Sequence, residues 1–222
     1  GGATMSHLRF GDQPIRSTYL IDEADYIGCH VQAYVNQYDV LKGLRNGGNF
    51  VLNCIWTEEE LESKLPAKMK RFIAENEINL YTINATKIAT EIGLGRRINM
   101  IMQSAFFKLA EIIPEDEAKD YLKASIKKAY GKKGDKVVNM NFEAVERGMN
   151  SLVKINVPAS WKDAEDAEVV ETKKVTDFVK NIMNPMNALE GDKLPVSAFN
   201  GIEDGTFPAG TAAYEKRGIA SE

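Results

Sequence analysis

The sequence predicts an α/β fold: a partial Rossmann-like parallel sheet with flanking helices, followed by an extended C-terminal arm. Two short apolar runs, 49–56 and 78–84, have the length and continuity of strands that are buried on both faces. Segments with helical spacing separate and follow them, and this alternation is typical of a parallel sheet. The segment 193–222 is rich in glycine and proline and has no periodicity, which predicts an arm laid over a partner.

The N-terminal quarter is expected to contain two strands and a long helix. The strands, Thr4–Phe10 and Ile15–Ile21, flank the turn sequence Gly11-Asp12-Gln13-Pro14. Asp25–Arg45 follows a helical pattern. We expect this helix to end at Asn46-Gly47-Gly48, where the two glycines permit a helix stop.

The middle of the chain carries clear start and stop signals. Thr57 is placed to cap a helix, and Glu60 completes a capping box with it. Pro66 predicts a break in that helix near Lys64, because proline lacks the N–H that continues a helix. Further helices are expected over 86–93, 98–113, 115–130, 139–154 and 174–189, with Pro185 breaking the last one.

The predicted helix 98–113 has more than one marked face at 100° per residue. A broad core face is expected from Ile101, Met102, Ala105, Phe106, Leu109, Ile112 and Ile113. The opposite side, expected to face solvent, holds Ser104, Lys108 and Glu111. A mixed sector combines Arg96, Asn99 and Gln103 with Met100, Phe107 and Ala110. Two interpretations remain open: a wide core stripe with polar edges, or a second face that another element covers.

Composition excludes several classes of function. The net charge of −4 argues against nucleic-acid binding, which normally uses a basic surface. The two cysteines, Cys29 and Cys54, and two histidines cannot provide an iron–sulfur or zinc framework within this chain. No apolar run approaches the roughly 18 residues of a membrane span, and no signal peptide opens the sequence. We therefore expect a cytoplasmic protein that binds neither nucleic acid nor membrane.

Catalytic motifs are incomplete. Gly93-Leu94-Gly95 resembles the start of a dinucleotide fingerprint, but Ile98 replaces its third glycine and a helix, not a strand, precedes it. No nucleophile elbow or metal pair with helical spacing occurs. The residues alone predict a binding or accessory domain with no catalytic residue and no metal ligand of its own.

The candidate binding residues are polar side chains near the predicted helix 98–113 and at a strand end. Arg96, Asn99 and Gln103 form the polar part of the mixed sector, and Arg97 could bridge two phosphate oxygens. Asn84 ends a predicted strand, where open parallel sheets bind ligands. The alternative for each is an ordinary capping or interface residue.

Several segments, in order along the chain, together resemble one family. They are Gly1–Gly11, Pro14–Ile21, Tyr81–Ala85, Gly93–Leu109 and Leu194–Thr211. The first four resemble the gamma-type domain of pyruvate:ferredoxin (flavodoxin) oxidoreductases, and the last resembles its linker toward a ferredoxin-like cluster domain. The resemblance implies a gamma-type domain over 1–190 that lacks the family's N-terminal strand and helix, and a linker or arm over 191–222. We expect an edge exposed in this way to be covered by the missing piece or by self-association.

The resemblance also implies a parent enzyme, usually a homodimer, that oxidatively decarboxylates pyruvate to acetyl-CoA. Its cofactors are thiamine diphosphate, magnesium and iron–sulfur clusters, and its electrons pass to ferredoxin or flavodoxin. The gamma-type domain packs near the active site and is associated with the access and binding of coenzyme A (CoA), while this chain alone would be inactive. Two alternatives remain: a free-standing module that binds CoA or a nucleotide, and a non-catalytic structural subunit.

Overall fold

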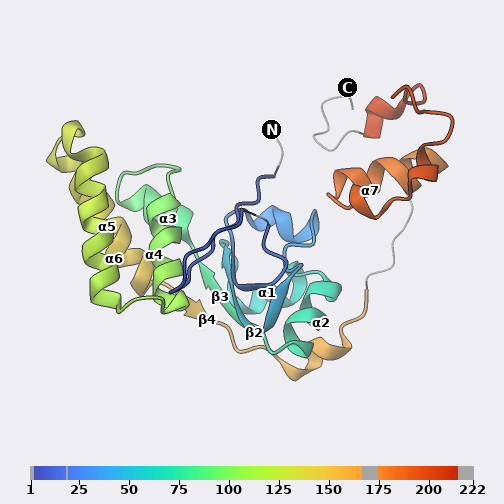
Figure 1. The fold of residues 1–222 in the computed structure, drawn as a ribbon. Coiled ribbons are helices and arrows are strands. Elements are labelled where there is room, and N and C mark those ends of the chain that lie inside the picture. The colour runs from blue at the N-terminus through green and yellow to red at the C-terminus, as the bar shows by residue number, and fades with distance from the viewer. Residues whose placement is uncertain (1–2, 19, 167–174, 215–222) are drawn as a thin grey trace. The chain divides into compact units, whose positions relative to one another are not determined.

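A computed structural model describes residues 3–18, 20–166 and 175–214 (Figure 1). The described chain divides into two compact units: one contains residues 3–36 and 40–166, and the other contains 37–39 and 175–214. The larger unit is an α/β structure in which helices cover both faces of a four-stranded sheet (Figure 1). The predicted fold class is therefore confirmed.

The sheet has the strand order β1-β2-β3-β4. β1 (Ala24–Cys29), β2 (Leu44–Asn53) and β3 (Asn79–Ile83) are parallel, and the short β4 (Val153–Lys154) is antiparallel to β3. Phe50, Val51, Leu52 and Leu80 are completely buried, as the continuous apolar runs predicted. Because side chains alternate along a strand, Phe50 and Leu52 belong to the core on one face and Val51 to the core on the other.

The first face is covered by η1 (Gln32–Asn36), α1 (Glu58–Lys64), α2 (Ala67–Glu75) and η3 (Ala159–Asp163). The predicted capping box is present: the Glu60 N–H donates to Thr57 Oγ1, and the Thr57 N–H donates to Glu60 Oε2 at 2.8 Å. The predicted break at Pro66 is also present, between α1 and α2.

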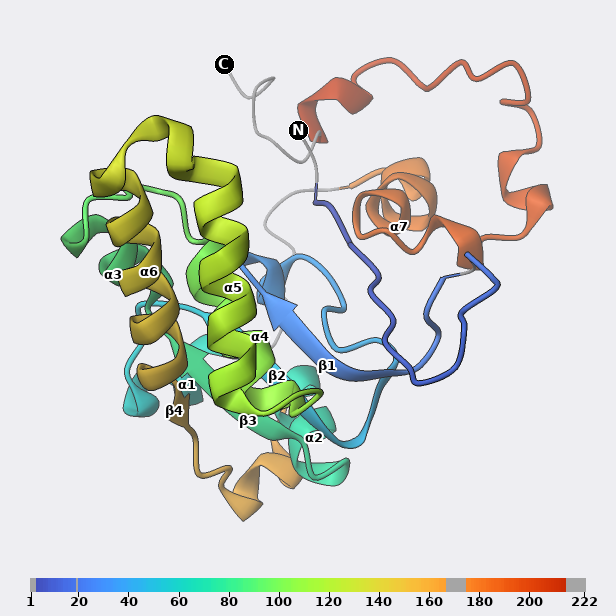
Figure 2. The same ribbon diagram turned by 60° about the vertical axis from the view of Figure 1, so that its left-hand side comes forward.

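The second face is covered by α3 (Ala85–Glu91), α4 (Asn99–Ala110) and α6 (Asp135–Asn150). α5 (Glu115–Tyr130) packs against α4 and α6, and the short η2 (Gly131–Lys133) joins it to α6 (Figure 2). Met100 and Phe107 of the mixed sector pack into the core between α5 and α6. The second apolar face of α4 is thus covered by elements of the same chain.

α4 and α6 approach each other closely at Gly148. A Cβ atom added to Gly148 would lie 2.6 Å from the Ile101 carbonyl oxygen and would overlap Ser104 Oγ. Ser104 is completely buried here and donates its hydroxyl to the Ile101 carbonyl at 2.8 Å. The prediction that Ser104 faces solvent is therefore wrong. The prediction that Ile112 belongs to the core face is also wrong, because Ile112 is exposed.

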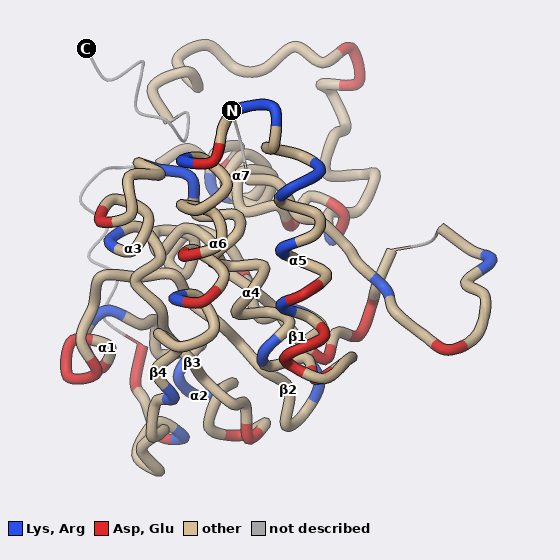
Figure 3. Tube along the Cα trace, turned by 90° about the vertical axis from the view of Figure 1, so that its left-hand side faces the viewer, with Lys and Arg blue, Asp and Glu red and all other residues tan. Residues whose placement is uncertain are grey.

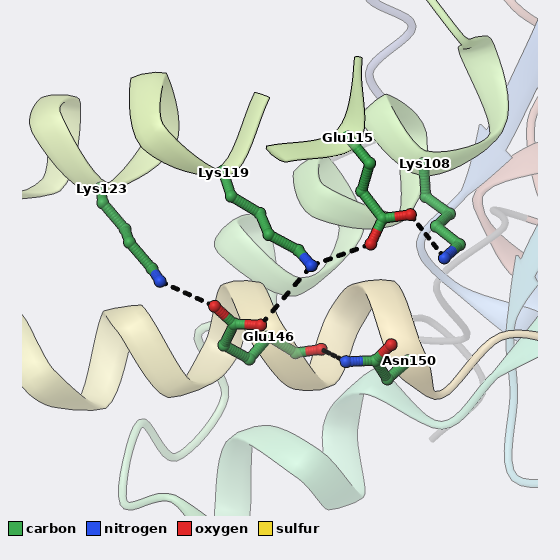
Figure 4. Close-up of polar contacts among 6 residues, drawn as sticks. All are labelled: Lys108, Glu115, Lys119, Lys123, Glu146 and Asn150. Atoms are coloured by element: carbon green, nitrogen blue, oxygen red, sulfur yellow. Dashed lines mark hydrogen bonds and ion pairs between the residues drawn. The ribbon is translucent and has the colours of Figure 1, made fainter. Parts of the chain in front are cut away.

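A ladder of charged side chains links α4, α5 and α6 (Figure 4). Lys108 of α4 and Lys119 of α5 contact Glu115 at 2.7 and 2.9 Å. Lys123 contacts Glu146 of α6 at 2.7 Å, and Lys119 reaches the same carboxylate at 3.8 Å. Hydrogen bonds from Lys108 and Lys119 lower the pKa of Glu115, and a hydrogen bond from Lys123 lowers the pKa of Glu146.

The two N-terminal strands predicted at Thr4–Phe10 and Ile15–Ile21 are wrong, since the described residues of both segments lack strand structure. They nevertheless lie side by side: the Ile21 N–H donates to His7 Nδ1 at 3.0 Å, and Arg9 Nη2 donates to the Leu20 carbonyl at 3.5 Å. No strand of the sheet pairs with them in the described chain. Phe10 stacks on Phe106 of α4 with ring centroids 5.8 Å apart.

The helix predicted over Asp25–Arg45 is also wrong, because this region contains β1, η1 and the start of β2. The Asn46-Gly47-Gly48 segment is not a helix stop. It lies inside β2, where the β1–β2 register is irregular and Gly47 adopts a φ of 72°, a conformation that favours glycine.

The last two predicted helices also differ from the helices in the structure. The helix predicted over 139–154 begins earlier, as α6, and its last residues form β4. Pro185 does not break its helix: a π-helical turn, η4 (Val179–Met183), leads directly into α7 (Asn184–Asn187), which contains the proline. The described residues after α7 include the short turns η5 (Gly191–Lys193), η6 (Val196–Phe199) and η7 (Thr211–Tyr214).

We predict that Gly148→Ala lowers the free energy of unfolding by about 1–3 kcal/mol, because the new methyl group overlaps backbone atoms of α4. Urea unfolding followed by circular dichroism measures the change. Gly131→Ala is the matched control, since nothing lies within 4 Å of its added Cβ and its φ is −52°. Equal stabilities of the two variants would contradict the close approach of α4 and α6.

The charge ladder predicts a pH dependence. The pKa values of Glu115 and Glu146 are lowered by folding, so their contribution is present above the unfolded-state pKa and disappears as the pH falls through the folded values. Unfolding free energy should therefore decline below about pH 4.3. The decline should be shallower in Glu115→Gln/Glu146→Gln than in Glu143→Gln, an exposed control on α6. Identical slopes for both variants would contradict a stabilising ladder.

Candidate functional site

The carboxyl end of the sheet carries a hollow of about 310 Å³. Its lining residues come from the chain just after β1, from the end of β2 and from the first turn of α3: His30, Val31, Gln32, Asn53, Cys54, Ile55 and Thr86. Parallel sheets commonly bind ligands at this edge, because the loops that follow neighbouring strands separate there. The chain after β2 leads to α1 on one face, whereas the chain after β3 leads to α3 on the other.

Asn53 holds this edge together. Its Nδ2 donates to the His30 carbonyl at 2.9 Å and lies 3.4 Å from Thr86 Oγ1, while its Oδ1 accepts from the Ala85 N–H at 2.9 Å. The Asn53 side chain is buried, and its bond with the Ala85 N–H is shielded from water. One amide therefore links the ends of β1 and β2 to the start of α3.

The remaining lining groups are neutral. Partial desolvation lowers the pKa of His30, which favours its uncharged imidazole. Burial likewise raises the pKa of Cys54, so its thiol stays protonated and is a weak nucleophile. Gln32 Oε1 accepts from the Ile55 N–H at 3.0 Å. The hollow can receive a neutral polar group, but no nucleophile–base pair is assembled in it.

The structure places the predicted site residues in two locations. Asn84 follows β3, as predicted, and its Oδ1 accepts from the Lys87 N–H at 2.9 Å as the N-cap of α3. The other four residues lie on the loop before α4 and on its first turns, and all are exposed: Arg96, Arg97, Asn99 and Gln103. Asn99 and Gln103 lie one turn apart on α4, whereas Arg96 and Arg97 precede the helix and do not continue that side.

These four side chains have no hydrogen bond or ion pair with any part of the chain that the structure describes. They are therefore available to a ligand or another surface. Sequence reasoning missed the residues that line the hollow, above all Asn53 and His30. Their position directly after two strands was the available signal, but the wrong helix assignment over Asp25–Arg45 concealed the first strand.

The described residues do not fit the cofactors that the family resemblance implies. Both cysteines, Cys29 and Cys54, are buried, whereas a cubane iron–sulfur cluster requires four thiolate ligands. Across residues 3–18, 20–166 and 175–214, no group of acidic, histidine or cysteine side chains could hold a metal ion. Within the same residues, no helix is long and apolar enough to cross a membrane.

Comparison with known proteins identifies the family. Residues 1–151 match the family described as pyruvate ferredoxin/flavodoxin oxidoreductase, and residues 164–220 match a family described as a domain of unknown function. The chain is 62% identical over 99% of its length to a pyruvate-flavodoxin oxidoreductase of Enterobacter agglomerans. It is 56% identical over 99% of its length to a pyruvate:ferredoxin oxidoreductase of Moorella thermoacetica.

The chain spans 19% of the length of each of these two relatives. A solved structure, pyruvate oxidoreductase subunit PORC of Thermotoga maritima, aligns with 17% identity and a TM-score of 0.48, covering 60% of this chain and 66% of that one. The family match over 151 residues and the close similarity along the whole chain lead to one conclusion: the chain belongs to the pyruvate ferredoxin/flavodoxin oxidoreductase family.

Proposed function

We propose that the chain is part of an enzyme that oxidatively decarboxylates pyruvate to acetyl-CoA and passes the electrons to flavodoxin or ferredoxin. The observation that carries this proposal is the 62% identity to a pyruvate-flavodoxin oxidoreductase over nearly the whole chain. The remaining domains of the enzyme would supply the thiamine diphosphate, magnesium and iron–sulfur sites. A homodimer, a cytoplasmic location and a domain boundary at residue 190 belong to the same proposal.

Within this enzyme, we propose that the α4 region assists the access and binding of CoA. CoA carries phosphate groups, and Arg96 and Arg97 are exposed guanidinium groups that can each bridge two phosphate oxygens. Asn99 and Gln103 offer amide donors and acceptors on the adjoining turns of α4. The hollow at the sheet edge contains no cation, so the α4 region matches the phosphates better.

The proposed activity is tested with the full-length enzyme and with this chain alone. Anaerobically purified full-length enzyme should reduce methyl viologen only when pyruvate and CoA are both present. This chain alone should be colourless and inert in the same assay, because its two buried cysteines cannot hold a cluster. A chain that reduces the dye by itself, or a full-length enzyme that ignores pyruvate, would contradict the proposal.

The CoA contacts predict a separation of binding from stability. In the full-length enzyme, Asn99→Ala/Gln103→Ala should raise the KM for CoA about fivefold or more, because each lost hydrogen bond leaves its partner unsatisfied. Arg96→Ala/Arg97→Ala should raise it at least as much. The melting temperature should stay unchanged, since all four side chains lack partners within the described chain.

Asn181→Ala, an exposed amide in the smaller unit, is the control and should alter neither quantity. If the α4 variants keep the wild-type KM for CoA, these residues are ordinary interface or surface groups and CoA binds elsewhere.

A further inference from the structure

Five lysines gather at the tip of the α5–α6 hairpin, on a chain whose net charge is −4. We call residues 127–136 the lysine tip; it contains Lys127, Lys128, Lys132, Lys133 and Lys136, all exposed. Its single acidic residue is Asp135. Figure 3 shows blue stretches, the colour of lysine and arginine, at the end of the α5–α6 hairpin.

Helix electrostatics do not account for every lysine of the tip. Lys127 and Lys128 lie in the last turn of α5, where cations interact favourably with the negative end of the helix dipole. Lys132 and Lys133 end η2, which continues from α5 and is separated from α6 by Gly134. Lys136 lies in the first turn of α6, where the dipole disfavours cations, and Gly134 leaves this helix end without a side-chain cap. Lys136 is therefore held where the local helix opposes its charge.

The lysines are not neutralised by the rest of the chain. Within the described residues, none of the five makes an ion pair, in contrast to Lys119 and Lys123 on the same hairpin. Lys133 lies over the Tyr130 ring, 5.4 Å from its centroid, and Lys127 lies 5.8 Å from the centroid of Phe142. The aromatic contacts orient two ammonium groups and leave the charge of the tip uncompensated.

The character of the tip points to a transient protein partner. Its exposed residues are lysine, alanine, glycine and aspartate, without an apolar centre, whereas permanent interfaces have apolar cores that are depleted of lysine. A hairpin tip also spreads its charges over a protruding surface, which suits the encounter with a complementary protein surface. Small interfaces guided by charge are characteristic of electron-transfer encounters.

From the placement of these charges, we propose that the lysine tip is a docking surface for an acidic protein that binds transiently to the enzyme. This proposal rests on the proposed function, and the partner is the protein that accepts the electrons from the enzyme. Its carboxylates would pair with the ammonium groups of Lys132, Lys133 and Lys136, and the charge of the tip would steer its approach.

The test uses the full-length enzyme with two acceptors. The first is purified flavodoxin of Klebsiella pneumoniae, whose pyruvate-flavodoxin oxidoreductase is 54% identical to this chain. The second is methyl viologen, a small dye that needs no protein docking. Lys132→Glu/Lys133→Glu should lower kcat/KM for flavodoxin about tenfold at low ionic strength, and added salt should reduce this difference. The rate with the dye and the KM for CoA should remain at wild-type values.

Lys42→Glu/Lys162→Glu is the matched control, because it makes the same change of net charge at two exposed lysines away from the tip. The proposal would be overturned if the tip variant lost no more kcat/KM for flavodoxin than this control. It would also be overturned if the tip variant lost as much activity with the dye as with flavodoxin, because that result indicates a structural role. Binding of the wild-type enzyme to phosphatidylserine vesicles that the tip variant abolishes, with unchanged flavodoxin kinetics, would assign the tip to a membrane instead. If the wild-type enzyme oxidises pyruvate with neither acceptor, it is the proposed function that fails.

Discussion

The close approach of α4 and α6 is the constraint on which the helical face of the larger unit depends. Gly148 has no side chain that would separate the two helices, and the Ser104 hydroxyl at the contact donates a hydrogen bond to the Ile101 carbonyl. With the backbones this close, Val51 of the sheet can share one core with α3, α4 and α6. The other side of α4 is then free to bury Met100 and Phe107 beneath α5. The polar residues at the start of α4 are exposed as a result.

Local signals in the sequence predict local structure well in this chain. The pair Thr57 and Glu60 and the position of Pro66 each locate a helix end, because the chemistry involved spans only a few residues. β1 and the start of β2 were not predicted, since their identity depends on pairing between strands that are distant in sequence. The same reason explains the N-terminal segments: the strand-like pattern at Thr4–Phe10 forms no strand, because no strand of the sheet pairs with it in the described chain.

The candidate site shows the same limit. Asn84 was placed correctly because the end of β3 was placed correctly. Asn53 was overlooked because it follows an apolar run and its three partners, just after β1 and on α3, become neighbours only in the folded sheet. Ser104 was assigned to solvent because a hydroxyl counts as polar in a periodicity plot, although it can bond to the preceding helical turn and pack against a glycine.

The uncharged lining of the hollow has an energetic consequence for selectivity. A carboxylate or phosphate that entered it would lose part of its hydration and would find no cationic side chain among the lining residues in exchange. Asn53 already commits its amide hydrogens and one acceptor position of its oxygen to the protein itself. The lining therefore favours groups that carry amides or hydroxyls without charge over small anions at this edge of the sheet.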